Sequence, residues 1–294
     1  MLRSFVFSFL LFVPHLAAAE VFEHCEDLAK PDDYNETVQQ DFLQNFPALV
    51  SSFSAVHAPI PHAPGHGMIG LNLSAVPYLS CEKQYVLDWT KTEDTNRTPV
   101  IPLPRISFSF PVSENAKFVP YGGVGYLPPV TIMETRTVLL SAELGFGYDF
   151  EGPFSAGLRG HATSMKIVAD VASHFSPDDP NVDDLFIGHT FGVDAMVGYD
   201  TPNVTPYLAV GFTDVSTFFY IGDNGVVTNN YHPYFGLTTS AGVDMLLAEK
   251  WRVGGEVYYA PGGYSLPDAD VESVEKTSRY GNLLTARMRL GREF

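Results

Sequence analysis

Two pairs of residues have the types that hydrolysis would need. His161 lies three residues before Ser164, and His189 lies five residues before Asp194. A histidine base activates a hydroxyl when the two side chains share a hydrogen bond, and an oxyanion donor must lie beside them. A histidine near a hydroxyl within one strand is common by chance, and the sequence assigns no oxyanion donor. We therefore expect no catalytic residue, and we keep a membrane-embedded hydrolase of lipid or protein as the alternative function.

Two further groups of side chains could bind metal ions. Carboxylate oxygens suit hard cations such as Ca²⁺, and one acidic stretch supplies Asp178, Asp179, Asp183 and Asp184. Imidazole suits zinc, but no compact ligand spacing is found among His57, His62 and His66. We interpret the acidic stretch as a solvated loop that divalent cations can bridge to anionic lipid headgroups. We interpret the histidine stretch as a linker, and we expect no metal site and no cofactor.

The amino terminus has the pattern of an export signal. MLRSFVFSFLLFVPHLAAAE combines an early Arg3, a short apolar run and three alanines before Glu20. This predicts a signal peptide over residues 1–19, cleaved after Ala19. An oxidising compartment favours bridged cysteines, so we expect a disulfide between Cys25 and Cys81. No later apolar run reaches the ~18 residues of a spanning helix, which leaves a soluble protein or one that crosses a membrane with strands.

Composition limits the partners and the class of fold. The chain has 34 acidic against 17 basic residues and a net charge of −17, which argues against nucleic acid as a partner. Its 15 tyrosines, 22 phenylalanines and 25 glycines favour strands and tight turns over helices. Only residues 20–66 differ, with clustered acidic residues and a helix-like apolar pattern: Val38, Phe42, Phe46, Leu49 and Phe53. The stretch HAPIPHAPGHG that ends this segment predicts an extended linker.

From residue 67 onward apolar and polar residues alternate with a period of two, which predicts strands. Three hairpins combine long strands with short turns: VLLSAELGFGYDFEGPFSAGLRGHAT, LFIGHTFGVDAMVGYDTPNVTPYLAVGF and YFGLTTSAGVDMLLAEKWRVGGEVYYA. We expect long polar loops at residues 168–184, 221–230 and 261–279. A strand at about 68–78, a hairpin of RISFSFPV and KFVPYGGVGYLPPV, and the terminal strand bring the count to about ten. Eight and twelve strands are the alternatives.

The length of these strands favours a transmembrane barrel over a soluble sandwich. Sandwich strands usually run about five or six residues, whereas a strand tilted across a bilayer uses about nine to eleven and can extend beyond it. Lipid offers no hydrogen bonds to a free edge, so the sheet must close. We predict an all-β fold: a closed antiparallel transmembrane β-barrel over residues 67–294, preceded by a short, partly helical segment. A soluble exported β-sandwich that acts as a binding module is the third interpretation.

The minor face of the strands carries charges of both signs, which a barrel would turn into its lumen. Opposite charges must pair there, because an unpaired charge loses solvation without compensation. The expected lumen-facing charged residues are Glu143, Arg159, Asp194, Asp244, Arg252, Glu256, Arg287 and Arg289. Glycines on the same face either leave room for water, solute or a plug, or relieve strand curvature.

The carboxyl terminus, LLTARMRLGREF, alternates in the same way and stops on an aromatic residue. Its apolar face consists of Leu284, Ala286, Met288, Leu290 and Phe294. In these features residues 67–294 resemble bacterial outer-membrane β-barrel proteins. The resemblance implies location in the outer membrane, contact with its lipids, and an insertion signal in these five residues that the barrel-insertion machinery reads. Arg292 departs from the pattern, at an interfacial position where an outward arginine costs little.

The expected function is passive or gated passage of small solutes, or a structural or surface role. A ten-stranded lumen is narrow, which favours gated, slight or absent conductance over an open pore. A bridge from Cys25 to Cys81 would draw the amino-terminal segment through the lumen, so residues 35–56 are a candidate plug. The sequence assigns no solute and no oligomeric state.

Overall fold

The computed structural model describes residues 52–76, 85–86, 91–92, 100–110, 117–132, 135–169, 183–221, 226–247, 250–261, 263–265 and 283–294. Within these ranges it contains strands and their connections. The described residues include no helix long and apolar enough to cross a membrane. The expected signal peptide, Cys25, Cys81, Asp178 and Asp179 lie outside the described residues, so the expectations about them stay predictions.

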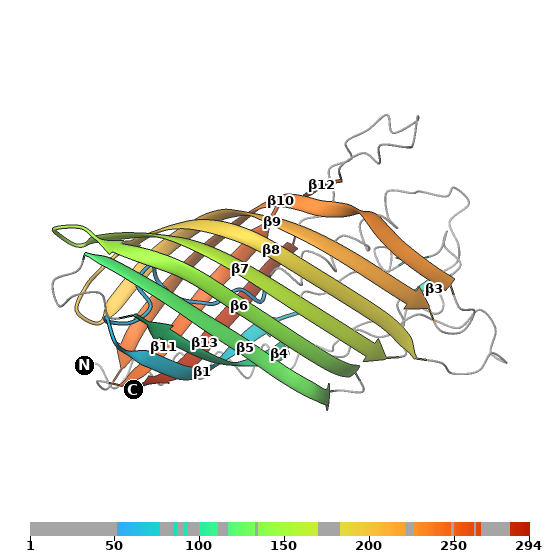
Figure 1. The fold of residues 1–294 in the computed structure, drawn as a ribbon, viewed down its shortest axis with the longest axis horizontal. Helices are drawn as coiled ribbons and strands as arrows, with labels where there is room; N and C mark the ends of the chain where they lie inside the picture. The colour runs from blue at the N-terminus through green and yellow to red at the C-terminus, as the bar shows by residue number, and fades with distance from the viewer. Residues whose placement is uncertain are drawn as a thin grey trace.

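Ten long strands form one closed antiparallel barrel (Figure 1). In chain order they are β1 (Gly67–Ala75), β4 (Val100–Ser109), β5 (Phe118–Ile132), β6 (Thr135–Asp149), β7 (Phe154–Ala169), β8 (Asp184–Tyr199), β9 (Val204–Ile221), β10 (Val226–Leu247), β11 (Trp251–Ala260) and β13 (Leu283–Glu293). The last strand, β13, pairs with both β11 and β1, which closes the ring. The predicted ten-stranded barrel is confirmed, and the eight-stranded, twelve-stranded and soluble-sandwich alternatives are wrong.

Three short strands lie outside this ring. β12 (Gly263–Ser265) pairs with β10, and β2 (Tyr85–Val86) pairs with β3 (Lys91–Thr92) in a separate two-stranded sheet. β3 and β12 fall in the connections at the end of the barrel opposite the chain terminus at Phe294, as Figure 1 shows, and β2 pairs with β3 there. We call this end the outer end and the end with Phe294 the inner end.

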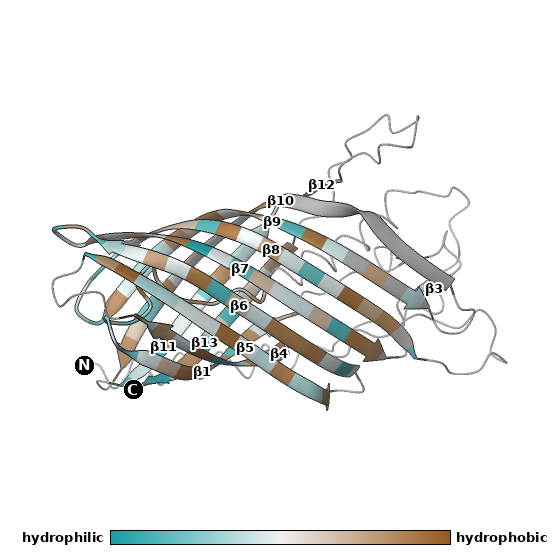
Figure 2. Ribbon diagram, viewed as in Figure 1, coloured by the Kyte–Doolittle hydropathy of each residue, from teal (hydrophilic) through white to brown (hydrophobic). Residues whose placement is uncertain are grey.

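Side chains alternate between the two faces of the barrel wall because successive residues of a strand point to opposite sides. On β6, Ser141 and Glu143 are buried inside, whereas Leu144 is 71% exposed on the outside. Figure 2 shows the same alternation of hydrophobic and hydrophilic residues along β5 to β9. The wall therefore has an apolar exterior and a buried, largely polar interior, which is the reverse of a soluble domain.

The exterior apolar belt has the height of a bilayer. Exposed aromatic side chains line its inner edge on three strands: Tyr148, Phe154 and Tyr199. Its outer edge is a row of exposed polar residues on β6 to β9: Arg136, Lys166, His189 and Asp214. The twelve steps between the thirteen residues from Phe154 to Lys166 rise about 40 Å along the strand, or about 30 Å along the membrane normal at a tilt of about 40°. This matches the hydrocarbon thickness of a membrane, about 30 Å.

The connections are short at the inner end, as the sequence predicts. Residues 150–153 join β6 to β7, and Gly152 adopts a φ of +140° there, which favours glycine over residues with a side chain. At the outer end the expected loop at 221–230 is wrong, because β9 runs to Ile221 and β10 starts at Val226. β9 and β10 remain paired beyond the apolar belt. Pairing with the neighbouring strand satisfies the backbone hydrogen-bonding groups of these polar residues.

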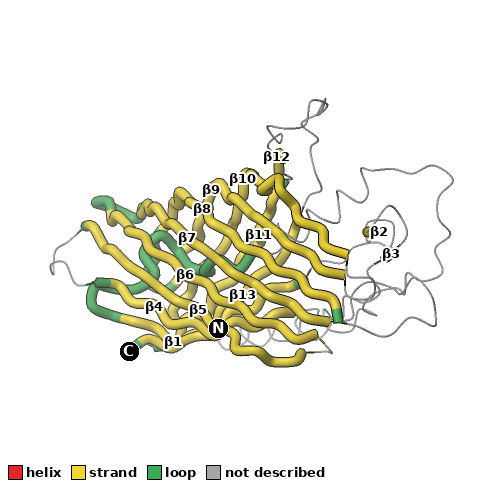
Figure 3. The backbone as a smooth tube through the Cα atoms, turned by 45° about the vertical axis from the view of Figure 1, so that its right-hand side comes forward, coloured by secondary structure: helices red, strands yellow, loops and turns green. Residues whose placement is uncertain are grey.

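Residues 52–62 lie inside the barrel and run from the middle of the lumen toward its inner end, and the exposed residues 63–66 lead from there to β1. Figure 3 shows this segment as a loop enclosed by the strands. Side chains along it are almost fully buried, including Phe53, Val56 and His57. Of the predicted helical pattern only Phe53 is described, and it lies in a turn. We call residues 52–62 the lumen segment.

Candidate functional site

All eight charged residues expected in the lumen lie on inward positions of the strands, and seven of them are buried. Arg252 is the more accessible one, with 19% of its side chain exposed. Two further wall residues belong with them: Arg105 on β4 and Glu293 at the end of β13. The ten residues give five arginines and five carboxylates, so the charges of this layer balance.

One cluster lies on β7 and β8, where Arg159 and Asp194 occupy paired positions. Nη2 and Nε of Arg159 donate to the same oxygen of Asp194, at 2.5 and 3.0 Å. Nε2 of His161 lies 3.4 Å from that oxygen. Two donors on one carboxylate oxygen hold the guanidinium in a fixed orientation, with Nη1 free to bond elsewhere.

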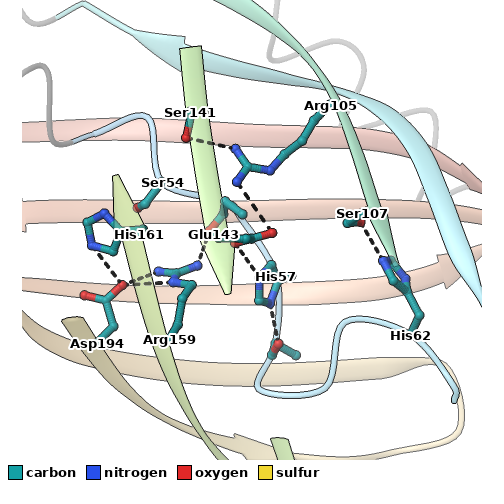
Figure 4. Close-up of polar contacts among 12 residues, drawn as sticks. Ser54, His57, His62, Arg105, Ser107, Ser141, Glu143, Arg159, His161 and Asp194 are labelled. Carbon is teal, nitrogen blue, oxygen red and sulfur yellow. Dashed lines mark hydrogen bonds and ion pairs between the residues drawn. The ribbon is translucent and has the colours of Figure 1, made fainter. Parts of the chain in front are cut away.

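A second cluster joins the wall to the lumen segment through Glu143 on β6. Its two carboxylate oxygens lie 3.5 Å from Arg105 Nη2 and 3.2 Å from Nε2 of His57, which belongs to the segment (Figure 4). Arg105 Nη1 also donates to the hydroxyl of Ser141 at 3.3 Å. His57 was expected to be an incidental linker residue, and this expectation is wrong because its ring is buried between Glu143 and Tyr121.

A third cluster spans β10, β11 and β13. Arg287 pairs with Glu256, which also accepts a hydrogen bond from the hydroxyl of Tyr207 at 2.8 Å. On the same strands Asp244 accepts from Arg289 at 2.7 Å and lies 3.5 Å from Arg252. Arg252 in turn pairs with Glu293. Every carboxylate of the charged layer therefore has an arginine partner, as desolvation requires.

The same wall residues bind the backbone of the lumen segment. Arg159 Nη1 donates to the carbonyl oxygen of Ala55 at 2.5 Å, and Arg287 Nη1 donates to that of Ser52 at 2.6 Å. Ser141 donates to the carbonyl oxygen of Phe53 at 3.1 Å. In the opposite sense, Asp244 accepts from the backbone N–H of Ala58 at 3.4 Å. These bonds satisfy backbone groups that have no strand neighbour.

The segment is anchored again near the inner end. Nε2 of His62 lies 2.7 Å from the Ser107 hydroxyl, and Nδ1 lies 3.4 Å from Glu293. Burial lowers the pKa of His62, against an opposing hydrogen bond to the Glu293 carboxylate that raises it. His62 was also expected to be incidental, and this expectation is wrong for the same reason as for His57. His66 remains exposed, as a linker residue would be.

Several lumen-facing glycines lie where the segment passes closest to the wall. A Cβ atom on Gly157 would stand 3.2 Å from Pro59, and one on Gly198 would stand 3.0 Å from the same proline. A Cβ on Gly147 would stand 2.6 Å from the Pro59 carbonyl oxygen and closer still to Ile60. Of the two roles that the sequence left open, room for a plug therefore applies at these three positions.

Other lumen glycines make room for side chains of the wall itself. A Cβ on Gly145 would stand 2.7 Å from the hydroxyl of Tyr121, and one on Gly242 would stand 2.7 Å from that of Tyr207. A Cβ on Gly192 would meet the ring of His161 at 2.5 Å. The inward glycines thus allow large polar side chains to lie across a narrow lumen.

The structure separates the residue pairs considered for hydrolysis. His161 points into the lumen and Ser164 lies on the alternate, outward parity of β7. His189 is exposed on the outside of β8, whereas Asp194 is buried inside. Neither pair can share a proton. Among the described residues, no group of three or more histidine, cysteine, aspartate or glutamate side chains is arranged to hold a metal ion. Of the four aspartates considered for Ca²⁺, Asp183 is exposed, and Asp178 and Asp179 lie outside the described residues.

The carboxyl-terminal residues take the faces that the sequence predicts. Leu284, Leu290 and Phe294 are 61%, 52% and 60% exposed on the outside, and Ala286 and Met288 share their parity. Their role as an insertion signal stays a prediction. The sequence also contained the signal for Arg105, because RISFSFPV places it on the same parity as Ser107. The strand was predicted from the sequence, but Arg105 was not assigned to the lumen.

No model of a known protein family and no curated protein matches this chain. Several solved structures have a similar fold. The translocator domain of the autotransporter NalP from Neisseria meningitidis is 10% identical, with a TM-score of 0.46 over 88% of this chain and 99% of that one. An outer membrane channel from Pseudomonas putida F1 is 9% identical, with a TM-score of 0.40 over 80% and 98%.

A third similar structure is the toluene transporter TodX from P. putida, 11% identical, with a TM-score of 0.36 over 81% of this chain and 77% of that one. Identities this low and TM-scores below 0.5 transfer neither activity nor ligand. The barrel assignment rests on the strand pairing, the apolar exterior and the charge-balanced interior of the chain itself.

Proposed function

We propose that the protein is an integral outer-membrane β-barrel whose lumen is closed by its own lumen segment, and that small solutes pass when this segment moves. The bilayer-high apolar exterior, the closed sheet and the export signal predicted from the sequence support the location. The binding of residues 52–62 across the charged layer supports the closure, because this segment occupies the space that a solute would need.

The observation that carries gating is the distribution of charge between segment and wall. The lumen segment, SFSAVHAPIPH, contains no aspartate, glutamate, lysine or arginine. The arginines that hold it, Arg159 and Arg287, each keep a carboxylate partner on the wall. Departure of the segment therefore leaves no buried charge alone, which would be the main cost of opening a charged lumen.

The side-chain contacts of His57 and His62 must break, together with hydrogen bonds between charged wall groups and the neutral backbone of the segment. Each of these backbone bonds contributes about 1.5–3 kcal/mol, and water entering the lumen would replace them. Pro59 and Pro61 have no backbone N–H, so this part of the segment has fewer wall bonds to break. A segment held this way can leave and return without unfolding the barrel.

A disulfide lock tests the proposal in planar bilayers. A Cβ on Gly157 would stand 3.2 Å from the Cβ of Pro59, close to the separation that a disulfide spans. We combine Pro59→Cys and Gly157→Cys with Cys25→Ser and Cys81→Ser, so that only the new pair can form. We expect brief channel openings under an applied potential in the reduced protein and none in the oxidised protein.

A charge-balanced variant should open more often. Arg159→Leu with Asp194→Asn, and Arg287→Leu with Glu256→Gln, remove the arginine bonds to the segment without leaving a buried charge unpaired. Retained gel-mobility shift on heating would show that the barrel still folds, and Lys166→Ala on the outside serves as the control. If neither the reduced lock variant nor the charge-balanced variant conducts in planar bilayers, gated passage is refuted and the structural or surface role is favoured.

A further inference from the structure

The interior of the barrel changes character on the outer side of the charged layer. Buried hydrophobic side chains from seven strands form one cluster there: Ile101, Leu103, Leu127, Leu139, Met165, Val215, Tyr258, Ala260 and Leu283. Each of them is at most 5% exposed. Val76, Val130 and Ile167 pack against the cluster. We call these residues the apolar layer.

The change occurs at equivalent places on neighbouring strands. On β4 the inward residues run from Arg105 outward to Leu103 and Ile101, and on β6 from Glu143 through Ser141 to Leu139. Two other strands repeat the change. On β11 the inward residue Glu256 is followed by Tyr258, and on β13 Arg287 is followed at the next inward positions by Thr285 and then Leu283. The apolar residues therefore recur at equivalent places on several strands, and buried polar residues are paired beside them on β1, β8 and β10: Ser74, Thr190 and Ser240.

One residue of the lumen segment belongs to both levels. The carbonyl oxygen of Phe53 accepts from Ser141 at the charged layer, while its ring is part of the apolar cluster and is 2% exposed. No other side chain of the segment is in this cluster. Movement of the segment away from Ser141 would withdraw the ring and leave an apolar space of about its size.

We propose that the apolar layer is the selective part of the lumen and that the place of the Phe53 ring is a binding site for a small apolar molecule. Apolar cavities in proteins stay dry and bind ligands such as benzene or xenon. Hydrophobic constrictions exclude water and ions by dewetting. The layer therefore admits apolar molecules of about phenyl size and opposes ions and hydrophilic solutes.

This inference rests on the proposed function for passage, but binding can be tested with the segment in place. Phe53→Ala empties the site without requiring the barrel to open. Crystals of this variant, exposed to xenon under pressure, should show one xenon atom among the apolar-layer residues, whereas wild-type crystals should show none there. Val56→Ala is the matched control, because Val56 is equally buried in the segment but lies beside Gly254, outside the apolar cluster.

Absence of xenon from the apolar layer of Phe53→Ala would overturn the binding site, whatever the conductance of the protein. Xenon in the Val56→Ala site and not in the Phe53→Ala site would overturn it equally, since the cavity would then be elsewhere. Because no opening is needed, this result is independent of the lock experiment, so failure of one proposal is distinguishable from failure of the other.

Conductance tests the selective role. In the reduced lock variant, Leu139→Asn with Met165→Gln should raise the fraction of time spent open about ten-fold, because polar side chains keep the layer wet. Leu139→Met with Met165→Leu preserves apolar character and should leave the open fraction unchanged. Equal open fractions for the polar and apolar pairs would show that the layer does not limit ions and would overturn this part of the proposal.

Discussion

At the scale of single residues, the buried charges of the lumen stabilise the barrel only when each has a partner of opposite sign. Arg159→Ala removes the partner of the buried Asp194 and the donor to Ala55. We expect it to destabilise the barrel by about 3–5 kcal/mol, because an uncompensated charge stays buried. Arg159→Ala with Asp194→Ala should recover most of this loss. Urea titration in detergent, followed by gel mobility, measures both changes.

The exposed pair of Lys117 and Glu151 is the control for this prediction. Its side chains are 47% and 87% exposed, with 2.6 Å between the charged atoms. Solvated pairs contribute at most about 1 kcal/mol, so Lys117→Ala should change stability by no more than that. If Arg159→Ala proved as mild as Lys117→Ala, the lumen pairs would be solvated and the charged layer would be an open aqueous surface.

At the scale of elements, the close passage of the lumen segment depends on glycines of the wall. Gly147→Ala places a methyl group 2.6 Å from the Pro59 carbonyl oxygen, so the segment must shift away from β6. Gly160→Ala on β7 is the matched control, since its methyl group would meet nothing nearer than 3.8 Å. Hydrogen exchange followed by mass spectrometry should show at least ten-fold faster exchange at residues 55–60 in Gly147→Ala only.

Equal exchange in Gly147→Ala and Gly160→Ala would mean that the segment is not pressed against this part of the wall. It would also return the lumen glycines to the other role that the sequence allows, relief of strand curvature. Each variant adds one methyl group to a barrel strand, on the inward face of β6 in Gly147→Ala and on the outward face of β7 in Gly160→Ala, so the strand propensity of alanine is similar in both.

The elements differ in how far the sequence predicts them. The strands and the faces of Glu143, Arg159 and Arg287 follow from the period of two, because one buried face fixes the parity of a whole strand. The lumen segment is harder to predict, since the wall binds its backbone and its sequence carries no charge. His57 and His62 therefore looked incidental. Leu139 shares the parity of Glu143, which places it on the inward face, but one such residue does not indicate an apolar layer.

At the scale of the whole molecule, the barrel closes where its two ends meet. Phe294 and Gly67 exchange two backbone hydrogen bonds, of 2.9 and 3.2 Å, beyond the last pairs of β13 with β1. The Phe294 side chain lies outside and is 60% exposed. The closing bonds and the exposed ring are thus separate properties of one residue, and a mutation can remove one without the other.

Phe294→Ala keeps the backbone bonds and removes only the ring, whereas deletion of Phe294 removes both. If the exposed ring is the part of the insertion signal that the assembly machinery reads, both variants should lower the fraction of heat-modifiable barrels in membranes by a similar amount, several-fold or more. Phe154→Ala is the control, because this ring is equally exposed at the inner edge of the belt, away from the terminus. A defect in the deletion alone would assign the effect to barrel closure, and an equal defect in Phe154→Ala would assign it to the loss of an interfacial aromatic residue.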